Sequence, residues 1–185
     1  MKRSARLFFS AVFLLSGIAS FATIPWVQKS QLESFWKAEP YYRCPVPILS
    51  DRVLIRNDAF GKGRFGASRG SKGQRSHKGV DLLVKVGNPI KASKSGRVIV
   101  AGIGKGYGWY VELLHPDGRR TRYAHLNKVV VSSGQWVRAG DVLGEAGKSG
   151  NAGDPRMRPH LHFEIREGDQ ALDPLKLMEP NLMVR

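Results

Sequence analysis

The distribution of glycine is the feature that most constrains how this chain can fold. Nineteen of the 21 glycines lie between Gly61 and Gly153. In the same stretch, short runs rich in β-branched and aromatic residues, such as GRVIVAG and WYVELLH, alternate with turn sequences such as HPDG and SSG. Glycine adopts the backbone conformations that tight turns and bulges require. Because no long segment shows an apolar period of about 3.6 residues, the pattern predicts an all-β fold with one compact antiparallel β domain.

The remainder of the chain divides into segments around this domain. We expect the β domain at residues 53–176, closed by a short turn or helix in LDPLKLM, and a C-terminal tail at residues 177–185. Residues 23–52 contain four prolines and several aromatic residues, which predicts a linker that packs partly on the domain and includes a brief helix in QKSQLESFWKA. Residues 61–79 are basic and rich in glycine, and we expect them to form a mobile loop.

Residues 1–22 have the anatomy of a secretory signal peptide. Lys2, Arg3 and Arg6 are followed by an uncharged apolar run and then by small residues at the place of a cleavage site. The uncharged stretch also approaches the length of a membrane span, so an uncleaved N-terminal anchor is the alternative. Either segment would export the rest of the chain to the periplasm or cell envelope, and the anchor would attach it to the inner membrane.

The charge of the chain predicts an anionic partner. Thirty Lys and Arg residues oppose 15 Asp and Glu residues, which gives a net charge of +15 in an otherwise ordinary composition. Nucleic acid, anionic lipid and acidic wall polymers would all satisfy this charge. Export, and the absence of a strand that combines aromatic with basic residues, argue against nucleic acid. We therefore expect binding to anionic envelope polymers, while the sequence leaves the oligomeric state open.

The single cysteine, Cys44, excludes an internal disulfide bond. Its surroundings, YRCPV, lack the small apolar residues that precede a lipid-modified cysteine. We expect a packed thiol or an occasional intermolecular bridge, and not a metal ligand.

The stretch RPHLHFEIRE has the alternation of a β-strand with one polar and one apolar face. His160, His162 and Glu164 have one parity, and Leu161 and Phe163 have the other. Successive side chains of a strand point to opposite faces, so the two imidazoles should point in the same direction. The two histidines could be polar residues at the protein surface, ligands of a metal ion, or acid–base catalysts.

A second motif, SHKGVDLL, places His77 four residues before Asp81 with Gly79 between them. In an extended chain these positions share a face, and Gly79 would leave room for something held between His77 and Asp81. Catalytic zinc commonly takes three protein ligands, histidines with a carboxylate, and leaves one position for water. The inventory of residues therefore fits a metal-assisted hydrolase, although neither motif alone is specific.

Taken in order, the motifs SHKGVDL, GYGWYVELLHPDGRRTRYAHL, VRAGDVLGEAGKSG and PHLHFEIR closely resemble the M23 peptidases. These are zinc endopeptidases of the lysostaphin or LytM type that cut peptidoglycan cross-links, and the likeness extends from about Arg64 to Pro174. The resemblance implies a small antiparallel β structure with a surface groove. It also implies that the substrate is the peptide stems of peptidoglycan, in which different members cut glycine bonds or meso-diaminopimelate–D-Ala bonds.

Carried over by position, the resemblance makes His77, Asp81 and His162 the ligands of Zn²⁺. It makes His160 the general base, and His125 the residue that stabilises the oxyanion or passes a proton to the leaving amine. These two roles could be exchanged without any change in the sequence. His115, in the HPDG turn, matches a position without a chemical role in the family, so we expect it at the surface.

One segment departs from the family pattern, and four other functions compete. Residues 151–158 form a longer loop than in compact members, and Arg158 replaces the usual glycine before PHLHFE, so we expect this loop to border the groove and affect specificity.

The main alternative is a non-catalytic or autoinhibited regulator of wall hydrolases, its groove covered by the loop after Gly61 or by the N-terminal segment. A non-haem iron oxygenase uses a similar triad, but export and the two spare histidines argue against it. A lipoyl-like carrier would have no use for the histidines, and nucleic-acid binding rests on charge alone.

Overall fold

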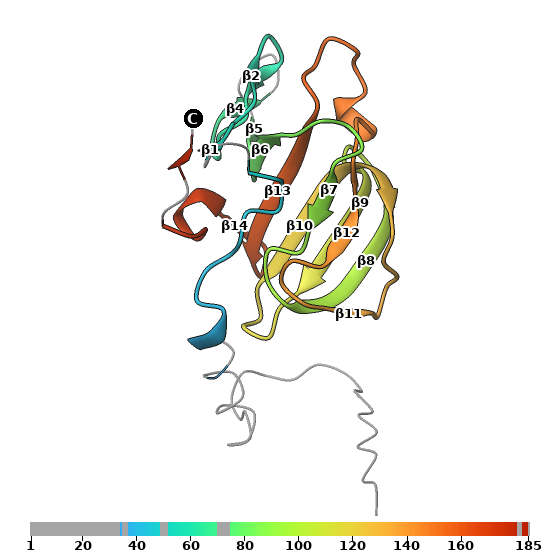
Figure 1. The fold of residues 1–185 in the computed structure, drawn as a ribbon. Coiled ribbons are helices and arrows are strands. Elements are labelled where there is room, and N and C mark those ends of the chain that lie inside the picture. Colours follow the sequence, from blue (N-terminus) through green and yellow to red (C-terminus); the bar gives the residue numbers. More distant parts are fainter. Residues whose placement is uncertain (1–33, 35–36, 49–51, 70–74, 181–182, 185) are drawn as a thin grey trace, which may run out of the picture.

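The computed structural model describes residues 34, 37–48, 52–69, 75–180 and 183–184 (Figure 1). The predicted signal peptide or anchor at residues 1–22 lies outside these ranges, as does most of the brief helix expected in QKSQLESFWKA. Within the described ranges, no helix is long and apolar enough to cross a membrane.

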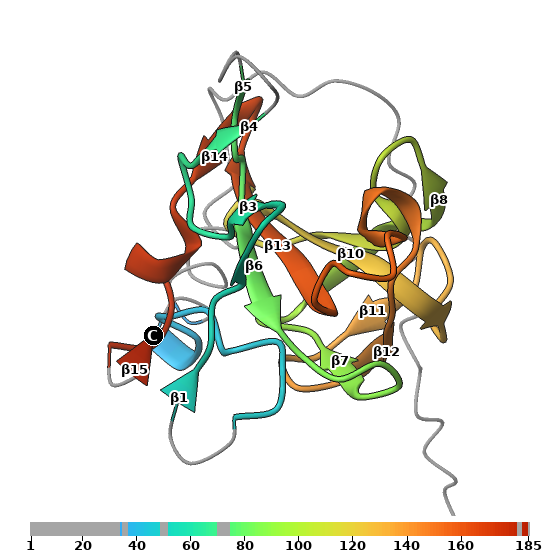
Figure 2. The ribbon, with the colours of Figure 1, turned by 90° about the horizontal axis from the view of Figure 1, so that it is seen from above.

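One sheet of nine strands makes up most of the molecule (Figure 1, Figure 2). Its strands are β6 (Val80–Leu83), β7 (Pro89–Lys91), β8 (Gly96–Gly104), β9 (Gly108–Leu114), β10 (Arg120–Val129), β11 (Trp136–Val137), β12 (Val142–Ala146), β13 (His160–Glu167) and β14 (Gln170–Leu172). The strand order is β11-β8-β9-β10-β12-β7, and β13 pairs with β10, β14 and β6. All of these pairings are antiparallel, which confirms the predicted all-β fold. The expected closing turn in LDPLKLM is the 3-10 helix η2 (Pro174–Lys176).

Strand β10 changes partners along its length. Its first half pairs with β13, ending with Ala124 opposite His162, and its second half pairs with β12 from Leu126 onward. The register against β9 shifts between Tyr123 and Leu126. His125 lies at this irregularity with φ of 64°, the only positive φ of a non-glycine residue in the described part of the chain. The point where β10 changes from β13 to β12 therefore gives His125 a backbone conformation that a regular strand would not allow.

Three pairs of two-residue strands lie outside the main sheet. β2 (Asn57–Asp58) pairs with β3 (Gly61–Lys62), β4 (Ser68–Arg69) pairs with β5 (Arg75–Ser76), and β1 (Arg52–Val53) runs parallel to β15 (Met183–Val184).

The loop expected at residues 61–79 is therefore wrong for the described residues, which form β3, β4 and β5, while the expected mobility stays a prediction. The Gly63 amide donates to the Arg56 carbonyl at 2.7 Å, and the Asp81 amide donates to the Gly63 carbonyl at 2.8 Å. A Cβ on Gly63 would lie 2.8 Å from the Asp81 Cβ, so this glycine permits a close approach to β6. Gly63, one of the glycines that suggested a loop, serves instead to pack a short extended segment against the sheet.

The core combines sheet residues with segments from both ends of the described chain. The sheet contributes Val80, Leu82, Ile90, Val98, Val111, Leu113, Tyr123, Leu126, Leu143, Leu161, Phe163 and Ile165. Tyr42, Val46, Val53 and Met178 are buried in the same cluster, so part of the 23–52 linker packs on the domain as expected. Cys44 packs against this cluster, and burial raises the pKa of its thiol to about 11, in accord with a packed thiol. The limits of the domain at 53 and 176 stay a prediction.

His115 is buried, which corrects the expectation that it lies at the surface. Only 2% of the residue is exposed. Its Nδ1 lies 2.9 Å from the Ser95 carbonyl oxygen, and its Nε2 lies 2.8 Å from the Thr121 hydroxyl. The Tyr42 ring covers it at 5.6 Å between ring centroids. The HPDG turn is at the surface, but its histidine points inward because the linker packs over it.

Candidate functional site

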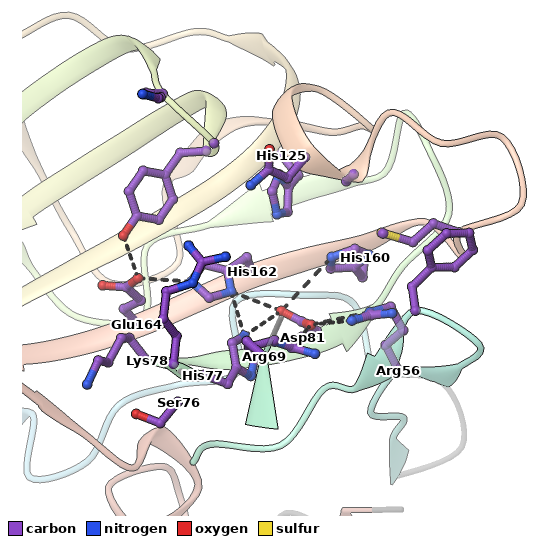
Figure 3. Close-up of a pocket in the computed structure, with 18 residues that line it drawn as sticks. Arg56, Arg69, Ser76, His77, Lys78, Asp81, His125, His160, His162 and Glu164 are labelled. Carbon is purple, nitrogen blue, oxygen red and sulfur yellow. Dashed lines mark hydrogen bonds and ion pairs between the residues drawn. The ribbon is translucent and has the colours of Figure 1, made fainter. Parts of the chain in front are cut away.

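All five predicted site residues line one groove of about 660 Å³ on the face of the main sheet (Figure 3). These are His77, Asp81, His125, His160 and His162. Two walls of the groove hold the central residues. The sheet wall consists of β6, β10 and β13 with the residue His77 that precedes β6, and the outer wall consists of residues 52–69. The end of β5, the turn between β8 and β9 and the loop at residues 151–158 complete the lining.

Strand pairing sets the positions of the central residues. In the antiparallel ladder of β6 and β13, Asp81 lies directly opposite His162. Side chains that face each other in such a ladder have Cβ atoms about 5 Å apart, close enough to share a ligand. Position 79 requires glycine for a reason other than the one expected. A Cβ there would lie 2.3 Å from the Phe163 carbonyl oxygen. The missing side chain lets the chain before β6 approach β13, and this brings His77 beside His162.

Three potential ligand atoms form a nearly equilateral triangle. His77 Nε2 lies 3.0 Å from Asp81 Oδ1 and 3.0 Å from His162 Nδ1, and His162 Nδ1 lies 2.9 Å from Asp81 Oδ1. Tetrahedral zinc with bonds of about 2.0 to 2.1 Å has ligand atoms roughly 3.3 Å apart. Within the described residues this is the one group of His, Cys, Asp or Glu side chains that could hold a metal ion. The donor set and its spacing therefore fit zinc.

Neighbouring groups orient these ligands. His77 Nδ1 lies 2.9 Å from the Arg64 carbonyl oxygen, so that nitrogen carries the proton and Nε2 presents its lone pair. His162 Nε2 lies 2.9 Å from Glu164 Oε1, which leaves Nδ1 to face the triangle. The protons themselves are inferred from these hydrogen-bond partners.

Asp81 is held from the outer wall. Arg56 donates to Asp81 Oδ2 from Nε at 3.2 Å and from Nη2 at 3.0 Å, and Arg69 Nη2 donates to the same oxygen at 2.9 Å. With Oδ2 bound by two guanidinium groups, Oδ1 is the oxygen that points to His77 and His162. Figure 3 shows Arg56 on the side of Asp81 that faces away from His162, and Arg69 below Asp81 near His77.

The site has a strong electrostatic preference for positive charge at its centre. Burial would raise the pKa of Asp81, but hydrogen bonds with His162 and His77 hold it well below its usual range. Burial opposes protonation of His162, yet its hydrogen bonds with Asp81 and Glu164 raise its pKa to about 9. Burial would also raise the pKa of Glu164, but the hydrogen bond and charge of His162, with the charge of Arg122 and the hydrogen bond from Tyr107, together lower it to about 2. A metal cation binding here would replace a proton as the partner of these carboxylates.

The other two histidines flank the triangle. The ring centroids of His125 and His160 are 5.1 Å apart, and His160 Nε2 lies 4.0 Å from Asp81 Oδ1. His160 Nδ1 lies 2.8 Å from the Arg158 carbonyl oxygen, and His125 Nδ1 lies 2.9 Å from that of Ser149, so each donates its proton away from the groove. Burial lowers the pKa of both, that of His125 to about 3 with help from the nearby His160 and His162. Both imidazoles are therefore neutral near pH 7, with Nε2 free to accept a proton.

Sequence reasoning missed several residues that support the site. Glu164 shares the parity of the histidines on β13, and that was the only signal for it. Arg69 ends the two-residue strand β4 and Arg56 directly precedes β2, in segments where no periodic pattern in the sequence marks an inward side chain. Tyr107 donates from its hydroxyl to Glu164 Oε1 at 2.9 Å, a contact between residues far apart in the chain.

The loop at residues 151–158 borders the groove as expected, through Asn151, Ala152 and Met157. Arg158 takes part through its main chain. Its amide lies 3.2 Å from Asp58 Oδ2, and its carbonyl accepts from His160. Neither contact uses the side chain, which explains why a residue other than glycine is accommodated there.

Comparison with known proteins agrees with this geometry. The sequence model for Peptidase family M23 matches residues 75–174, more than half of the chain. A Pseudomonas aeruginosa protein named lipoprotein NlpD/LppB homolog is 37% identical over 117 residues, 63% of this chain and 36% of that protein. The peptidoglycan DD-endopeptidase ShyB of Vibrio cholerae is 34% identical over 100 residues, 54% of this chain and 22% of that protein.

A solved structure supports the same relationship. The catalytic domain of the antimicrobial peptidase lysostaphin from Staphylococcus simulans matches with a TM-score of 0.55 and 34% identity, over 63% of this chain and 88% of that one. The chain spans only between 22% and 36% of the length of the two curated relatives above. With its fold, its groove and the family match in agreement, the chain belongs to peptidase family M23.

Proposed function

We propose that this chain is a zinc-dependent endopeptidase that hydrolyses the peptide cross-links of bacterial peptidoglycan. The observation that carries the proposal is the triangle of His77, Asp81 and His162 with two neutral imidazoles beside it in one open groove. Relatives named as a peptidoglycan endopeptidase and as lysostaphin support the choice of substrate.

In this proposal, His77, Asp81 and His162 would hold a zinc ion, whose chemistry would be to lower the pKa of a bound water molecule and to polarise the peptide carbonyl. His160 Nε2 accepts a proton from the attacking water, since its Nδ1 proton is directed to the Arg158 carbonyl. His125 Nε2 is likewise an acceptor in this tautomer, so His125 could donate to the oxyanion or protonate the leaving amine only after it takes over the proton that His160 accepts from the water. The roles of His160 and His125 can be exchanged within this geometry.

The location and the wider partners belong to the same proposal. Residues 1–22 would export the chain to the periplasm or cell envelope, either as a cleaved signal peptide or as an inner-membrane anchor. The net charge of +15 would hold the enzyme near anionic envelope polymers. Binding to isolated sacculi should then weaken as salt rises, and salt-independent binding would refute this part.

The test is to incubate the zinc-loaded chain with purified peptidoglycan and to analyse the soluble products. We expect fragments with new peptide amines, which a chelator abolishes, zinc restores and His160→Ala prevents. New glycan ends in place of peptide amines would contradict the proposal. Tight zinc binding without any cleavage would favour a non-catalytic or autoinhibited regulator, and metal analysis that finds iron would favour an oxygenase.

A further inference from the structure

His125 is held in the groove by a turn that lies outside its own strand. We call residues 149–151 the Ser149 turn. His125 Nδ1 donates to the Ser149 carbonyl oxygen at 2.9 Å, across 24 positions of the sequence. His160 Nδ1 donates instead to the carbonyl of Arg158, two residues before it in the chain. The orientation of His160 is therefore determined locally, whereas that of His125 depends on where the Ser149 turn lies.

The hydroxyl of Ser149 fastens this turn to the irregularity of β10. Its Oγ donates to the Leu126 carbonyl at 2.7 Å and accepts from the Trp109 amide at 2.9 Å. Leu126 and Trp109 are partners in the ladder of β10 and β9, at the point where its register shifts. A bulge disrupts the ladder locally, so main-chain groups there need other partners. One hydroxyl therefore satisfies a main-chain group of each strand directly beside His125.

Two glycines allow the Ser149 turn to approach β9 so closely. Gly108 and Gly150 have φ of 65° and 63°, which glycine adopts readily. A Cβ on Gly108 would lie 2.3 Å from Ser149 Oγ, and a Cβ on Gly150 would lie 2.4 Å from the Gly108 nitrogen. The Asn151 amide also donates to the Gly106 carbonyl at 2.9 Å. The serine and glycine of the GKSG motif therefore build a tight junction with the start of β9.

The backbone of His125 needs such a junction. Its φ of 64° lies in the left-handed region, and such a conformation persists only where the surroundings hold it. The His125 amide donates to the Tyr107 carbonyl at 2.9 Å, and its ring donates to Ser149, so both contacts come from outside β10. Figure 3 shows the His125 side chain directed toward His160 and His162. Loss of the Ser149 contact should therefore free this ring.

We propose that Ser149 is a positioning residue: its hydroxyl fixes the turn whose carbonyl holds the Nδ1 proton of His125, which leaves Nε2 to face the groove as an acceptor. Without the hydroxyl the carbonyl is no longer fixed, and the proton of the neutral ring can occupy Nε2 instead. His125 could then no longer take over the proton that His160 accepts from water. This inference rests on the proposed function and adds a residue to its mechanism.

Ser149→Ala should lower kcat about 10- to 100-fold, because a misplacement of about 1 Å can cost a reacting group roughly that much. KM should stay the same, since the contact acts on proton transfer and not on substrate binding. In the described part of the chain, the hydrogen bonds of Ser149 reach Trp109, Leu126 and His125, none of which is a proposed metal ligand. Zinc content should therefore stay at the wild-type level.

The decisive measurement is the tautomer of each histidine, read from imidazole nitrogen chemical shifts of the full chain with and without zinc. At pH 7.5 burial keeps both His125 and His160 neutral. We expect both to carry the proton on Nδ1 in the wild type. Ser149→Ala should move part of the His125 population to the Nε2 tautomer and leave His160 unchanged, because the acceptor of His160 is local. A purely structural role would not single out one histidine.

Two control variants accompany this measurement. Ser149→Thr keeps the hydroxyl and should keep the wild-type tautomer of His125. Ser95→Ala removes a hydroxyl that also accepts from a main-chain amide, that of Ala139, and donates to a side chain, that of Glu39. Ser95 does not line the groove, so this variant should change neither the tautomer nor kcat.

The wild type alone can overturn the inference. A His125 proton on Nε2, or no coupling across the hydrogen bond between His125 Nδ1 and the Ser149 carbonyl carbon, would refute it even where Ser149→Ala does not fold. An unchanged His125 tautomer in folded Ser149→Ala would refute it too, as would a loss of zinc, which would place the effect at the metal site. If no peptide is cleaved, the proposed function fails, and the tautomers still decide whether Ser149 positions His125.

Discussion

The sheet wall and the outer wall both hold Asp81, but they do so by different means. On the sheet wall, the ladder of β6 and β13 places Asp81 opposite His162, and main-chain hydrogen bonds determine the spacing. On the outer wall, Arg56 approaches from the residue before β2 and Arg69 from β4, and both bind the other carboxylate oxygen through side-chain ion pairs. One wall depends on backbone register and the other on charge.

The two walls differ in how strongly they determine the positions of the side chains at the site. Register in a sheet with a buried face is strongly specified, because a slip of one residue turns every side chain to the opposite face. Ligand positions on the sheet wall are therefore rigid. The ion pairs from Arg56 and Arg69 orient a carboxylate that the sheet already holds in place, so their loss should lower the metal affinity of the site without abolishing metal binding.

The largest expected effect comes from removing a ligand from the sheet wall. His162→Ala deletes one of three donors and leaves Asp81 and Glu164 without their shared partner. We expect loss of stoichiometric zinc and of peptidoglycan cleavage, measured by metal analysis after gel filtration and by product release. Retention of one zinc per chain with unchanged affinity would show that His162 is not a ligand.

The second effect separates proton transfer from metal binding within the same wall. His160→Ala and His125→Ala remove neutral imidazoles that point into the groove beside the triangle. General acid–base groups contribute about 10²- to 10⁴-fold, so kcat should fall by that order while zinc content stays at one per chain. Loss of zinc in either variant would mean that these residues hold the metal, and an unchanged kcat would exclude them from catalysis.

The third effect addresses the outer wall. Arg56→Gln removes two hydrogen bonds to Asp81 Oδ2, and Arg69→Gln removes one from a side chain that is 20% exposed. Groups that orient a ligand typically contribute about 10- to 100-fold in metal affinity or activity. We expect zinc affinity, measured by competition with a chromophoric chelator, to fall within that range for Arg56→Gln and by less for Arg69→Gln.

Two controls accompany the third test. Arg56→Lys keeps the charge but not the paired geometry, so its affinity should lie between those of wild type and Arg56→Gln. Lys91→Gln changes an exposed cation outside the groove and should have no effect. If zinc affinity is unchanged in both arginine variants, the sheet wall alone positions Asp81.

The same contrast explains what the sequence could predict. Alternation around His160 and His162 is a local pattern that determines which side chains share a face, and the family resemblance supplied His77, Asp81 and His125. The all-β fold followed from short runs and turns in the same way. Arg56 lies 25 residues from Asp81, and a contact between such distant residues leaves no periodic signal in either segment. The glycines around Gly63 indicated a loop because tight turns and close packing against a strand require the same residue.

The smallest expected effect concerns His115, which belongs to neither wall. His115→Gln loses part of a buried hydrogen-bond pair with Ser95 and Thr121, so we expect the free energy of unfolding to fall by about 1 to 3 kcal/mol with unchanged kcat. Burial lowers the pKa of His115, so below about pH 6.5 the unfolded chain binds a proton that the folded chain does not. Its contribution to stability is present above that pH and is lost as pH falls.

Between pH 7.5 and 5.5 the wild type should therefore lose up to about 1.4 kcal/mol more stability than His115→Gln. Urea unfolding of both proteins at the two pH values measures this difference, and the groove histidines cancel because both proteins contain them. An equal pH dependence would show that His115 keeps an ordinary pKa despite its burial. A loss of zinc in His115→Gln would instead connect this buried histidine to the sheet wall through β10, and the separation between structural and functional histidines would fail.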